Sequence, residues 1–205
     1  MYPSLAQQMI FVFDLIGIFV FAISGALAAD RKNMDIFGYI VIGLLPAIGG
    51  GTLRDLILDA PVFWVEKPIY LWVAVAGGVL TFFAPVRLGR RLKTLIWLDA
   101  LGLSLFCVLG ASKALMITSS ITVAITMGLV TAVVGGILRD VVTNEVPLVL
   151  QREIYATAAF MGAVTYAFLS LSPVTEPFAL LTGGTVAFLI RAAGIHFQLS
   201  LPQKR

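Results

Sequence analysis

The sequence predicts an all-α integral membrane protein with seven transmembrane helices, arranged as two inverted three-helix repeats plus a seventh helix. The first observation is composition. Of the 205 residues, 60% are hydrophobic and 12% are charged, and the mean hydropathy is +1.00, whereas soluble domains average about 45–50% apolar and about 25% charged residues. The second observation is that a pattern of charged residues and glycines recurs after 85 residues.

Seven apolar stretches are close to the roughly 20 residues with which a helix crosses the hydrocarbon core. The first stretch is not a signal peptide, because no positively charged segment precedes it and Asp14 interrupts it. The alternation typical of membrane barrel strands is absent, and the short loops indicate a single transmembrane domain, residues 1–205. The predicted helices cover residues 9–29, 36–58, 69–86, 95–113, 119–142, 153–172 and 177–196.

The internal repeat aligns residues 14–84 with 99–169 without a gap. Chance similarity between apolar stretches does not readily align charged residues together with glycines. Each repeat (9–86 and 95–172) holds three helices, an odd number, so the second repeat enters the membrane upside down, as in many transport proteins. The matched pairs include Asp14/Asp99, Gly17/Gly102, Phe21/Phe106, Gly25/Gly110, Gly43/Gly128, Gly50/Gly135, Gly51/Gly136, Arg54/Arg139, Asp55/Asp140, Tyr70/Tyr155 and Gly77/Gly162.

Lysine and arginine are distributed unevenly between the two sets of loops, and this asymmetry predicts the orientation of the chain. We place the richer set in the cytoplasm, so that the N-terminus lies outside and the C-terminus is cytoplasmic. The opposite side carries Lys67, with Lys113 near a helix end. The predicted cytoplasmic residues are Arg31, Lys32, Arg87, Arg90, Arg91, Lys93, Arg152, Lys204 and Arg205.

Two glycine motifs interrupt the second and fifth helices. Residues 49–55 read GGGTLRD and residues 135–140 read GGILRD. Pro46 lacks a backbone N–H and crowds the preceding turn, so we expect a kink or local unwinding, milder in the second copy, where Thr131 replaces the proline. The predicted kink and pathway positions are Pro46, Gly49, Gly50, Gly51, Thr52, Val134, Gly135 and Gly136.

A backbone carbonyl freed by such a kink cannot face lipid, because an unpaired polar group is costly there. It must be buried in protein or line a watery path, where its oxygen can replace part of the hydration shell of a monovalent cation. The alternative is that the glycines only let helices approach closely. The symmetry of the two motifs, the nearby proline and the adjoining charges favour a transport path.

Each glycine motif ends in an arginine and an aspartate, Arg54-Asp55 and Arg139-Asp140. Adjacent helix residues point about 100° apart, so we do not expect an arginine to pair well with its own neighbour. Charges within the membrane are costly and usually face the bundle interior or water. Two roles stay open for these charges: structural clasps that hold kinked helices, or groups that gate a pore or tune its field.

Asp14 and Asp99 begin the apolar parts of the first and fourth helices, and they are candidate partners for the arginines. An aspartate near a helix N-terminus opposes the macrodipole, and as a pore-mouth acid it would also concentrate cations. Lys113 ends the fourth helix and has no charged counterpart, since Ala28 occupies its place in the first repeat. We expect its side chain to snorkel to the interface. Aromatic residues near helix ends are predicted interfacial anchors: Trp64, Trp72, Tyr70 and Tyr155.

The two glycine–Arg–Asp motifs on the second and fifth of seven helices resemble those of the trimeric intracellular cation (TRIC) channels and their prokaryotic homologues, along essentially the whole chain. The resemblance implies a homotrimer in a prokaryotic inner membrane. Each protomer would have its own hourglass-shaped pore, lined mainly by the first, second, fourth and fifth helices and kinked at the glycine motifs. The second motif departs from the triple glycine at Val134. The Lys-Glu-Val tripeptide of animal members is absent, so phosphoinositide and calcium regulation is not carried over.

These features predict a passive channel for monovalent cations, K⁺ over Na⁺, with membrane lipids as further partners and with Thr52, Ser24 and Thr131 as polar pore groups. One alternative is a secondary transporter of glycine or another small zwitterion, since the same prokaryotic domain has been described as a putative glycine transporter. A membrane scaffold is a third class. The lone Cys107 and lone His196 lie at opposite sides, so we expect no enzyme, structural metal or cofactor, and nothing indicates nucleic-acid binding.

Overall fold

The computed structural model describes residues 5–84, 91–151 and 154–200. The predicted cytoplasmic residues Arg87, Arg90, Arg152, Lys204 and Arg205 therefore lie outside the described residues. The described chain is helical throughout apart from short connections. Its helices are α1 (Leu5–Arg31), α2 (Ile36–Ile57), α3 (Phe63–Glu66), α4 (Ile69–Phe83), α5 (Arg91–Thr118), α6 (Ile121–Val142), the 3-10 helix η2 (Leu148–Leu150), α7 (Ala156–Leu169) and α8 (Glu176–Phe197).

The elements themselves recur after 85 residues. Helices α2 and α6 begin and end at equivalent positions. The short helix α3 begins at Phe63, and η2 begins 85 residues later at Leu148. Both long helices are capped alike at their N-termini, where Asp35 accepts a hydrogen bond from an amide of α2 and Ser120 accepts one from an amide of α6. The local signals that start each helix were therefore duplicated together with the apolar stretches.

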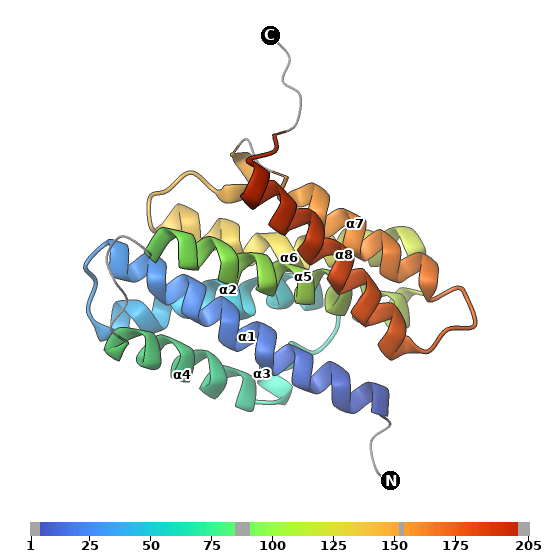
Figure 1. Cartoon of the computed structure of the whole chain (residues 1–205). Coiled ribbons are helices and arrows are strands. Elements are labelled where there is room, and N and C mark those ends of the chain that lie inside the picture. The colour runs from blue at the N-terminus through green and yellow to red at the C-terminus, as the bar shows by residue number, and fades with distance from the viewer. Residues whose placement is uncertain (1–4, 85–90, 152–153, 201–205) are drawn as a thin grey trace.

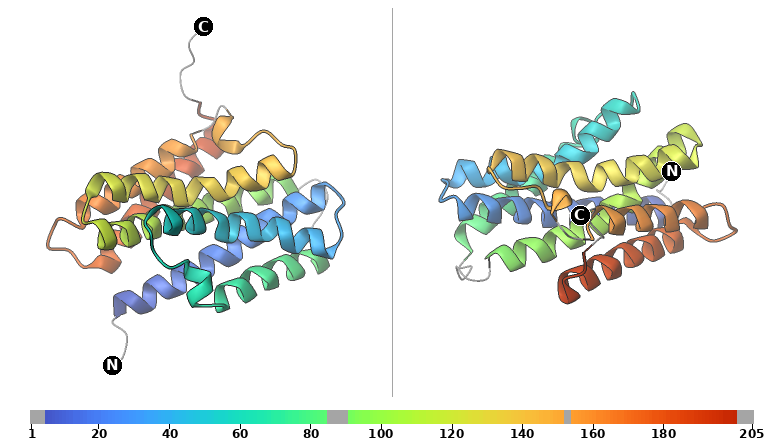
Figure 2. Two further views of the ribbon diagram at one scale, coloured as in Figure 1. Left: turned by 180° about the vertical axis from the view of Figure 1, so that it is seen from behind. Right: turned by 90° about the horizontal axis from the view of Figure 1, so that it is seen from above.

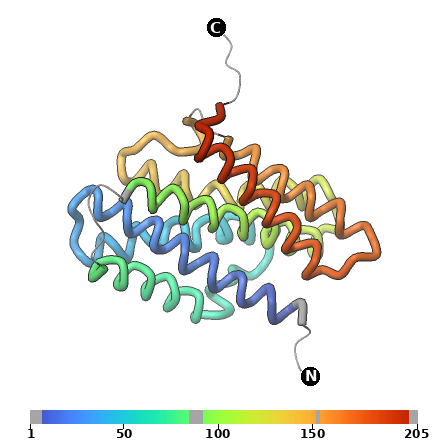
Figure 3. The backbone as a smooth tube through the Cα atoms, viewed as in Figure 1, coloured from blue at the N-terminus to red at the C-terminus, as the bar shows by residue number. Residues whose placement is uncertain are grey.

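Equivalent helices of the two repeats run in opposite directions. In Figure 1, α1 runs from the N-terminus at the right toward the left, and α5 runs back toward the right. The tube in Figure 3 shows the same reversal and the oblique course of α8 across the bundle. Figure 2 shows α7 and α8 side by side, and these two helices are in contact along the described chain.

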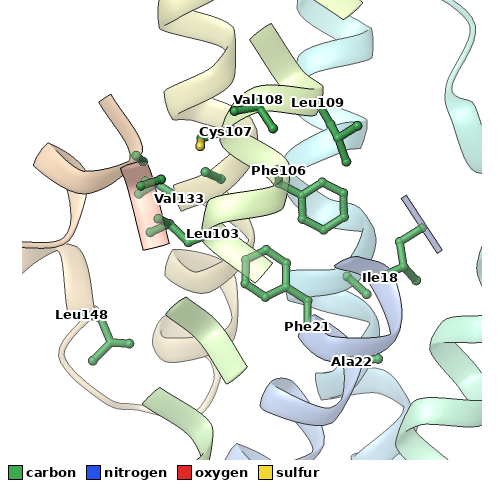
Figure 4. Packing of buried hydrophobic residues seen from close by; sticks show 14 of the residues in the cluster. Ile18, Phe21, Ala22, Leu103, Phe106, Cys107, Val108, Leu109, Val133 and Leu148 are labelled. Atoms are coloured by element: carbon green, nitrogen blue, oxygen red, sulfur yellow. The ribbon is translucent and has the colours of Figure 1, made fainter. Parts of the chain in front are cut away.

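The core is centred where the two repeats meet. The rings of Phe21 on α1 and Phe106 on α5, which are equivalent residues, stack with centroids 5.3 Å apart and 22° between their planes (Figure 4). Each ring covers a glycine of the other repeat: a Cβ on Gly17 would lie 3.1 Å from Phe106, and one on Gly102 would lie 2.2 Å from Phe21. These reciprocal contacts are those of a two-fold interface within one chain.

Within the described ranges, five helices are long and apolar enough to cross a membrane: α1, α2, α5, α6 and α8. Helices α4 and α7 are apolar but have only 15 and 14 residues, shorter than the predicted stretches 69–86 and 153–172. Fifteen residues rise about 22 Å, less than the roughly 30 Å of the hydrocarbon core. Helix α4 ends before Ala84 because Pro85 follows, and a residue that precedes proline avoids helical geometry.

Candidate functional site

A cavity of about 880 Å³ lies between α1, α2, α4 and α5, with the start of α8 at its edge. Its wall combines aromatic rings with groups of both charges, among them Asp14, Arg54, Tyr70, Lys113 and Glu176. Charged side chains within an apolar bundle usually face the bundle interior or a water-filled cavity, and this wall is such a place. The cavity belongs to the first repeat, although α5 supplies part of its wall.

Asp55 is the centre of the first charge cluster, and it is completely buried. Its Oδ1 atom lies 2.8 Å from Nε of Arg54 and 2.8 Å from Nζ of Lys113. Its Oδ2 atom accepts a hydrogen bond of 3.0 Å from the backbone amide of Phe63, at the start of α3. The carboxylate thus joins α2 to α5 and to the loop that leads into α4.

Arg139 is the centre of the second charge cluster, and it is also completely buried. Its Nε atom donates to Oδ1 of Asp140 at 2.8 Å, and its Nη1 atom donates to Oδ1 of Asp99 at 2.6 Å. The same Nη1 atom donates to Oγ of Ser24 at 2.7 Å. Oδ2 of Asp140 accepts from the amide of Leu148 at 3.0 Å, so this cluster joins α5, α6, η2 and α1.

The prediction that each arginine would not pair with its own neighbour is wrong in both repeats. The 100° between adjacent positions applies to the Cβ atoms, and the long arginine side chain bends back far enough for Nε to reach the next carboxylate. The predicted contact with Asp99 is present for Arg139. Lys113 was expected to snorkel, but its ammonium group pairs with Asp55 and its side chain is 26% exposed.

The two clusters differ in their access to the cavity. Arg54 lines the cavity, whereas Arg139 is enclosed by protein. Two sequence differences accompany this asymmetry. Lys113 has Ala28 as its equivalent, and Ser24, which receives a hydrogen bond from Arg139, has Leu109 as its equivalent. The first cluster therefore has an extra cation, and the second cluster has a hydroxyl that ties it to the opposite repeat.

The glycine motifs do not unwind their helices, because α2 and α6 continue as α-helix through residues 49–51 and 135–136. Gly50 and Gly135 lie instead where α2 and α6 touch. A Cβ on Gly50 would lie 2.1 Å from the carbonyl oxygen of Thr131, and one on Gly135 would lie 2.6 Å from that of Pro46. These two glycines therefore let the backbones of α2 and α6 approach closely, which is the packing role that the sequence left open. No larger residue permits this contact.

The other motif positions have separate environments. A Cβ on Gly49 would lie 2.9 Å from the Leu138 side chain, and Val134, its equivalent, is half-buried on α6. Gly51 lines the cavity and faces the ring of Phe63, at 2.7 Å from its Cβ position. The glycines of the motifs thus combine packing positions with one position on the cavity wall, Gly51.

The carbonyl that Pro46 frees is the oxygen of Ile42, one helical turn earlier. A Cβ on Gly25 of α1 would lie 2.4 Å from this oxygen, so the glycine lets the backbone of α1 cover the unpaired carbonyl. Close Cα–H···O contacts of this kind are common between packed helices. The freed carbonyl is therefore buried in protein, the first of the two outcomes expected from the sequence.

The polar side chains that were predicted to face a pore have hydrogen-bond partners within the bundle. Thr52 donates to the carbonyl of Ile48 at 2.7 Å and accepts from Nε1 of Trp64 at 2.9 Å. Thr131 donates to the carbonyl of Met127 at 2.6 Å. Ser24, besides accepting from Arg139, lies 3.4 Å from the carbonyl of Leu95.

Neither Asp14 nor Asp99 lies near a helix N-terminus, so the macrodipole interpretation is wrong. Helix α1 begins at Leu5 and α5 at Arg91, because both helices extend into polar residues that lie outside the apolar stretches. Tyr70 and Tyr155 are not interfacial anchors either, since they are only 4% and 1% exposed. Their recurrence at the same offset as the aspartates is the signal that could have grouped them with the charged residues.

Tyr70 belongs to the first cluster, where its hydroxyl lies 3.5 Å from Oδ2 of Asp14. Sequence reasoning also missed a polar contact at the edge of the cavity. There Ser112 of α5 donates to Oε1 of Glu176 at 2.9 Å, which ties α8 to the second repeat. Among the described residues, no group of three or more His, Cys, Asp or Glu side chains could hold a metal ion.

Known proteins resemble this chain in both sequence and fold. A family model described as "Glycine transporter" matches twice, at residues 11–85 and 96–170, which are equivalent ranges of the two repeats. The chain is 43% identical over 200 residues to the UPF0126 inner membrane protein YadS of Escherichia coli (strain K12), covering 95% of this chain and 96% of that protein. It is 42% identical over 205 residues to a UPF0126 membrane protein of Vibrio cholerae serotype O1, covering 97% and 84%.

A solved structure has the same fold. The TRIC trimeric intracellular cation channel orthologue from Rhodobacter sphaeroides is 45% identical and superposes with a TM-score of 0.90, over 94% of this chain and 100% of that chain. The doubled family match, the identity along nearly the whole sequence and the common fold agree. The chain is therefore a multi-pass integral membrane protein of the glycine-transporter family and a prokaryotic homologue of the TRIC channels.

Proposed function

We propose that the protein is a passive channel for monovalent cations, with one pathway in each protomer of a homotrimer. The observation that carries this proposal is the cavity of about 880 Å³, whose charged wall lies inside an apolar bundle. The fold shared with the orthologue from Rhodobacter sphaeroides supports a cation as the transported species and a trimer as the assembly. No step of the proposal requires an energy source, so flux follows the electrochemical gradient.

The pathway enters through the cavity and passes between α1, α2, α5 and α6. The carboxylates of Asp14 and Glu176 attract cations at the cavity wall, while Arg54 and Lys113 keep the local charge balanced. Beyond the α2–α6 contact, the pathway meets the second cluster around Arg139. Preference for K⁺ over Na⁺ follows from the weaker hydration of K⁺, because removing part of its hydration shell costs less free energy.

In the membrane, we propose seven crossings, with the two repeats inserted in opposite directions and α8 as the seventh span. The opposite courses of α1 and α5 support this arrangement, and bilayer thinning accommodates the short α4 and α7. The positive-inside rule places Arg31 at the end of α1, Lys32 in the following turn and Lys93 near the start of α5 in the cytoplasm of an inner membrane. Lipids contact the many exposed apolar side chains.

Purified protein in planar bilayers tests the proposal. Unitary currents with a reversal potential that favours K⁺ over Na⁺ under bi-ionic conditions are expected. Absence of unitary currents from protein that is folded and trimeric would contradict it. The orientation is tested separately in cells, with single cysteines introduced at Lys32 and Glu66 and an impermeant maleimide. Only the cysteine at position 66 should react from outside, and native Cys107 is buried.

A second candidate function is secondary transport of glycine or another small zwitterion. The description of the matching family model and the mixed charge of the cavity wall favour it. Arg54 would bind the carboxylate and Asp14 the amine, while the two repeats rock against each other. Saturable glycine exchange in proteoliposomes, without unitary K⁺ currents, would select this function over the channel.

A further inference from the structure

Arg191 of α8 is charged and completely buried, although α8 lies outside both repeats. The other buried residues of this helix are small or apolar: Ala179, Leu180, Gly183, Ala187 and Gly194. A guanidinium inside a membrane bundle is costly, and such a group usually faces the bundle interior and interacts with a specific partner there. The partner of Arg191 therefore indicates what this helix contributes to the bundle.

Close backbone contacts hold α8 on either side of Arg191. A Cβ on Gly183 would lie 2.8 Å from the carbonyl oxygen of Gly162 on α7, and one on Gly162 would lie 2.9 Å from that of Gly183. Beyond Arg191, a Cβ on Gly194 would lie 3.4 Å from the side chain of Ile154. Small residues join membrane helices in this way. The packing of α8 thus fixes Arg191 against the residues that precede α7.

The guanidinium of Arg191 lies against the aromatic ring of Tyr155. Its Cζ atom is 5.0 Å from the ring centroid, and its Nη1 atom donates to the carbonyl oxygen of Ile154 at 3.5 Å. A cation at this distance is attracted to the face of the ring. The hydroxyl at the other end of Tyr155 makes a side-chain hydrogen bond with Asp99. Tyr155 therefore links Arg191 to the second charge cluster.

Each charge cluster is one cation short if only the repeated positions are considered. These positions supply one arginine and two aspartates to each cluster: Arg54, Asp14 and Asp55 to the first, and Arg139, Asp99 and Asp140 to the second. Lys113 supplies the missing cation in the first cluster, where it pairs with Asp55. Its equivalent in the second repeat is Ala28, which cannot do so. Arg191 supplies a cation next to the second cluster instead.

We propose that Arg191 is the counter-cation of the second cluster and the residue that positions Tyr155 against Asp99. It acts across the tyrosine ring, whereas Lys113 acts on the first cluster by direct contact. The helix outside the repeats therefore completes the charge balance of the second repeat. This role does not depend on what the protein transports, so its test does not require a transport assay.

A cycle of substitutions in the full-length protein tests the charge balance. Arg191→Met keeps a long side chain but removes the cation, and it should lower the melting temperature in detergent, because it leaves an excess negative charge buried. Adding Asp99→Asn removes this excess, so the double variant should melt above Arg191→Met alone. The matched control adds Asp14→Asn to Arg191→Met. It removes the same charge from the first cluster and should restore nothing.

The conservative variant Arg191→Lys separates charge from packing. It should melt closer to the wild type than Arg191→Met does, whereas a role in apolar packing alone predicts the reverse order. The proposal is overturned if Arg191→Met melts like the wild type, or if the effects of Arg191→Met and Asp99→Asn simply add. If Arg191→Met yields no folded protein, the yield replaces the melting temperature. Recovery of folded protein by Asp99→Asn then supports the proposal, and no recovery contradicts it.

Discussion

At the residue scale, Arg54 and Arg139 occupy equivalent positions of one motif but have different surroundings. Arg54 borders the cavity and shares Asp55 with Lys113. Arg139 binds two carboxylates and a hydroxyl in the protein interior. The two roles that the sequence left open, clasp and gate, are therefore proposed to divide between the repeats, with Arg139 as the clasp and Arg54 as the group that acts on ions.

Replacing each arginine by glutamine tests this division. Arg139→Gln leaves Asp99 without its buried partner, and removing one partner of a buried ion pair costs roughly 3–5 kcal/mol, so the yield of folded protein should fall sharply. Arg54→Gln should preserve the yield, because Lys113 still neutralises Asp55, but should alter the current of each channel. Yield is measured by size-exclusion chromatography and current in planar bilayers. Equal losses of yield in both variants would contradict the division.

Lys113 is the one cation that α5 contributes to the wall of the cavity. Lys113→Gln makes the cavity more negative and should raise the single-channel K⁺ conductance, most clearly at low ionic strength, where charges are less screened. The control is the same substitution at Lys93, which lies outside the cavity wall. Recordings at two salt concentrations check the prediction, and a conductance that falls, or that does not depend on salt, would count against it.

At the scale of helices, the repeated glycines are positions where helix backbones meet. Gly25 faces the carbonyl of Ile42, and its equivalent Gly110 faces the carbonyl of Met127 and the Thr131 side chain. Gly43 likewise faces the carbonyl of Ala22. Lipid tails are as apolar as leucine, so close backbone packing rather than the hydrophobic effect holds such helices together. Duplicated glycines therefore mean duplicated helix contacts.

Gly50→Ala should weaken the contact between α2 and α6. Its Cβ would lie 2.1 Å from the carbonyl oxygen of Thr131, and backbone atoms at a helix crossing cannot move aside independently. Overpacking of this kind costs about 1–3 kcal/mol, which should lower the melting temperature in detergent. Gly194→Ala, with its nearest neighbour at 3.4 Å, is the control and should melt like the wild type. Equal melting temperatures in the wild type and both variants would contradict the prediction, because they would show that α2 and α6 can move apart to accommodate the added methyl group.

At the scale of the whole molecule, partly exposed ion pairs connect the two repeats at one end of the bundle. Glu145, in the loop after α6, lies 2.8 Å from Nζ of Lys32 and 3.6 Å from Arg31, at the end of α1. The positions equivalent to these three residues are Ala60, Ile117 and Met116, which cannot form such pairs. These ion pairs therefore make the end that carries Glu145 sensitive to pH and salt, and the equivalent positions of the other repeat cannot contribute the same sensitivity.

The hydrogen bond from Lys32 lowers the pKa of Glu145 below its ordinary value of 4.5. The unfolded chain binds this proton more readily, so the stabilisation is complete above about pH 4.5 and is lost as the pH falls through the lowered pKa. The pair is exposed, so the effect is small and high salt should reduce it. Thermal unfolding of the wild type and Glu145→Gln across this range checks the prediction. An identical pH dependence in the two proteins would contradict it.

Much of the fold follows from local signals. The caps at Asp35 and Ser120 and the long apolar stretches predict where α2 and α6 lie, because both depend on residues close in the sequence. The predicted stretches for α4 and α7 are longer than the helices themselves, because apolar residues continue beyond the helix ends. The partners of Lys113 and Tyr155 could not be predicted from spacing, because they depend on which helix faces pack against each other.

By itself, the sequence determined that this is a helical membrane protein with a duplicated architecture, because composition, periodicity and repetition depend only on the order of the residues. It also identified the arginines and aspartates as the unusual charges. Only the tertiary structure decided that Gly50 and Gly135 pack backbones, that one cluster borders a cavity, and that the other is sealed. The physical reason is that equivalent positions such as Ala28/Lys113 and Ser24/Leu109 carry different side chains, and the effect of each difference appears only when helices of opposite repeats are in contact.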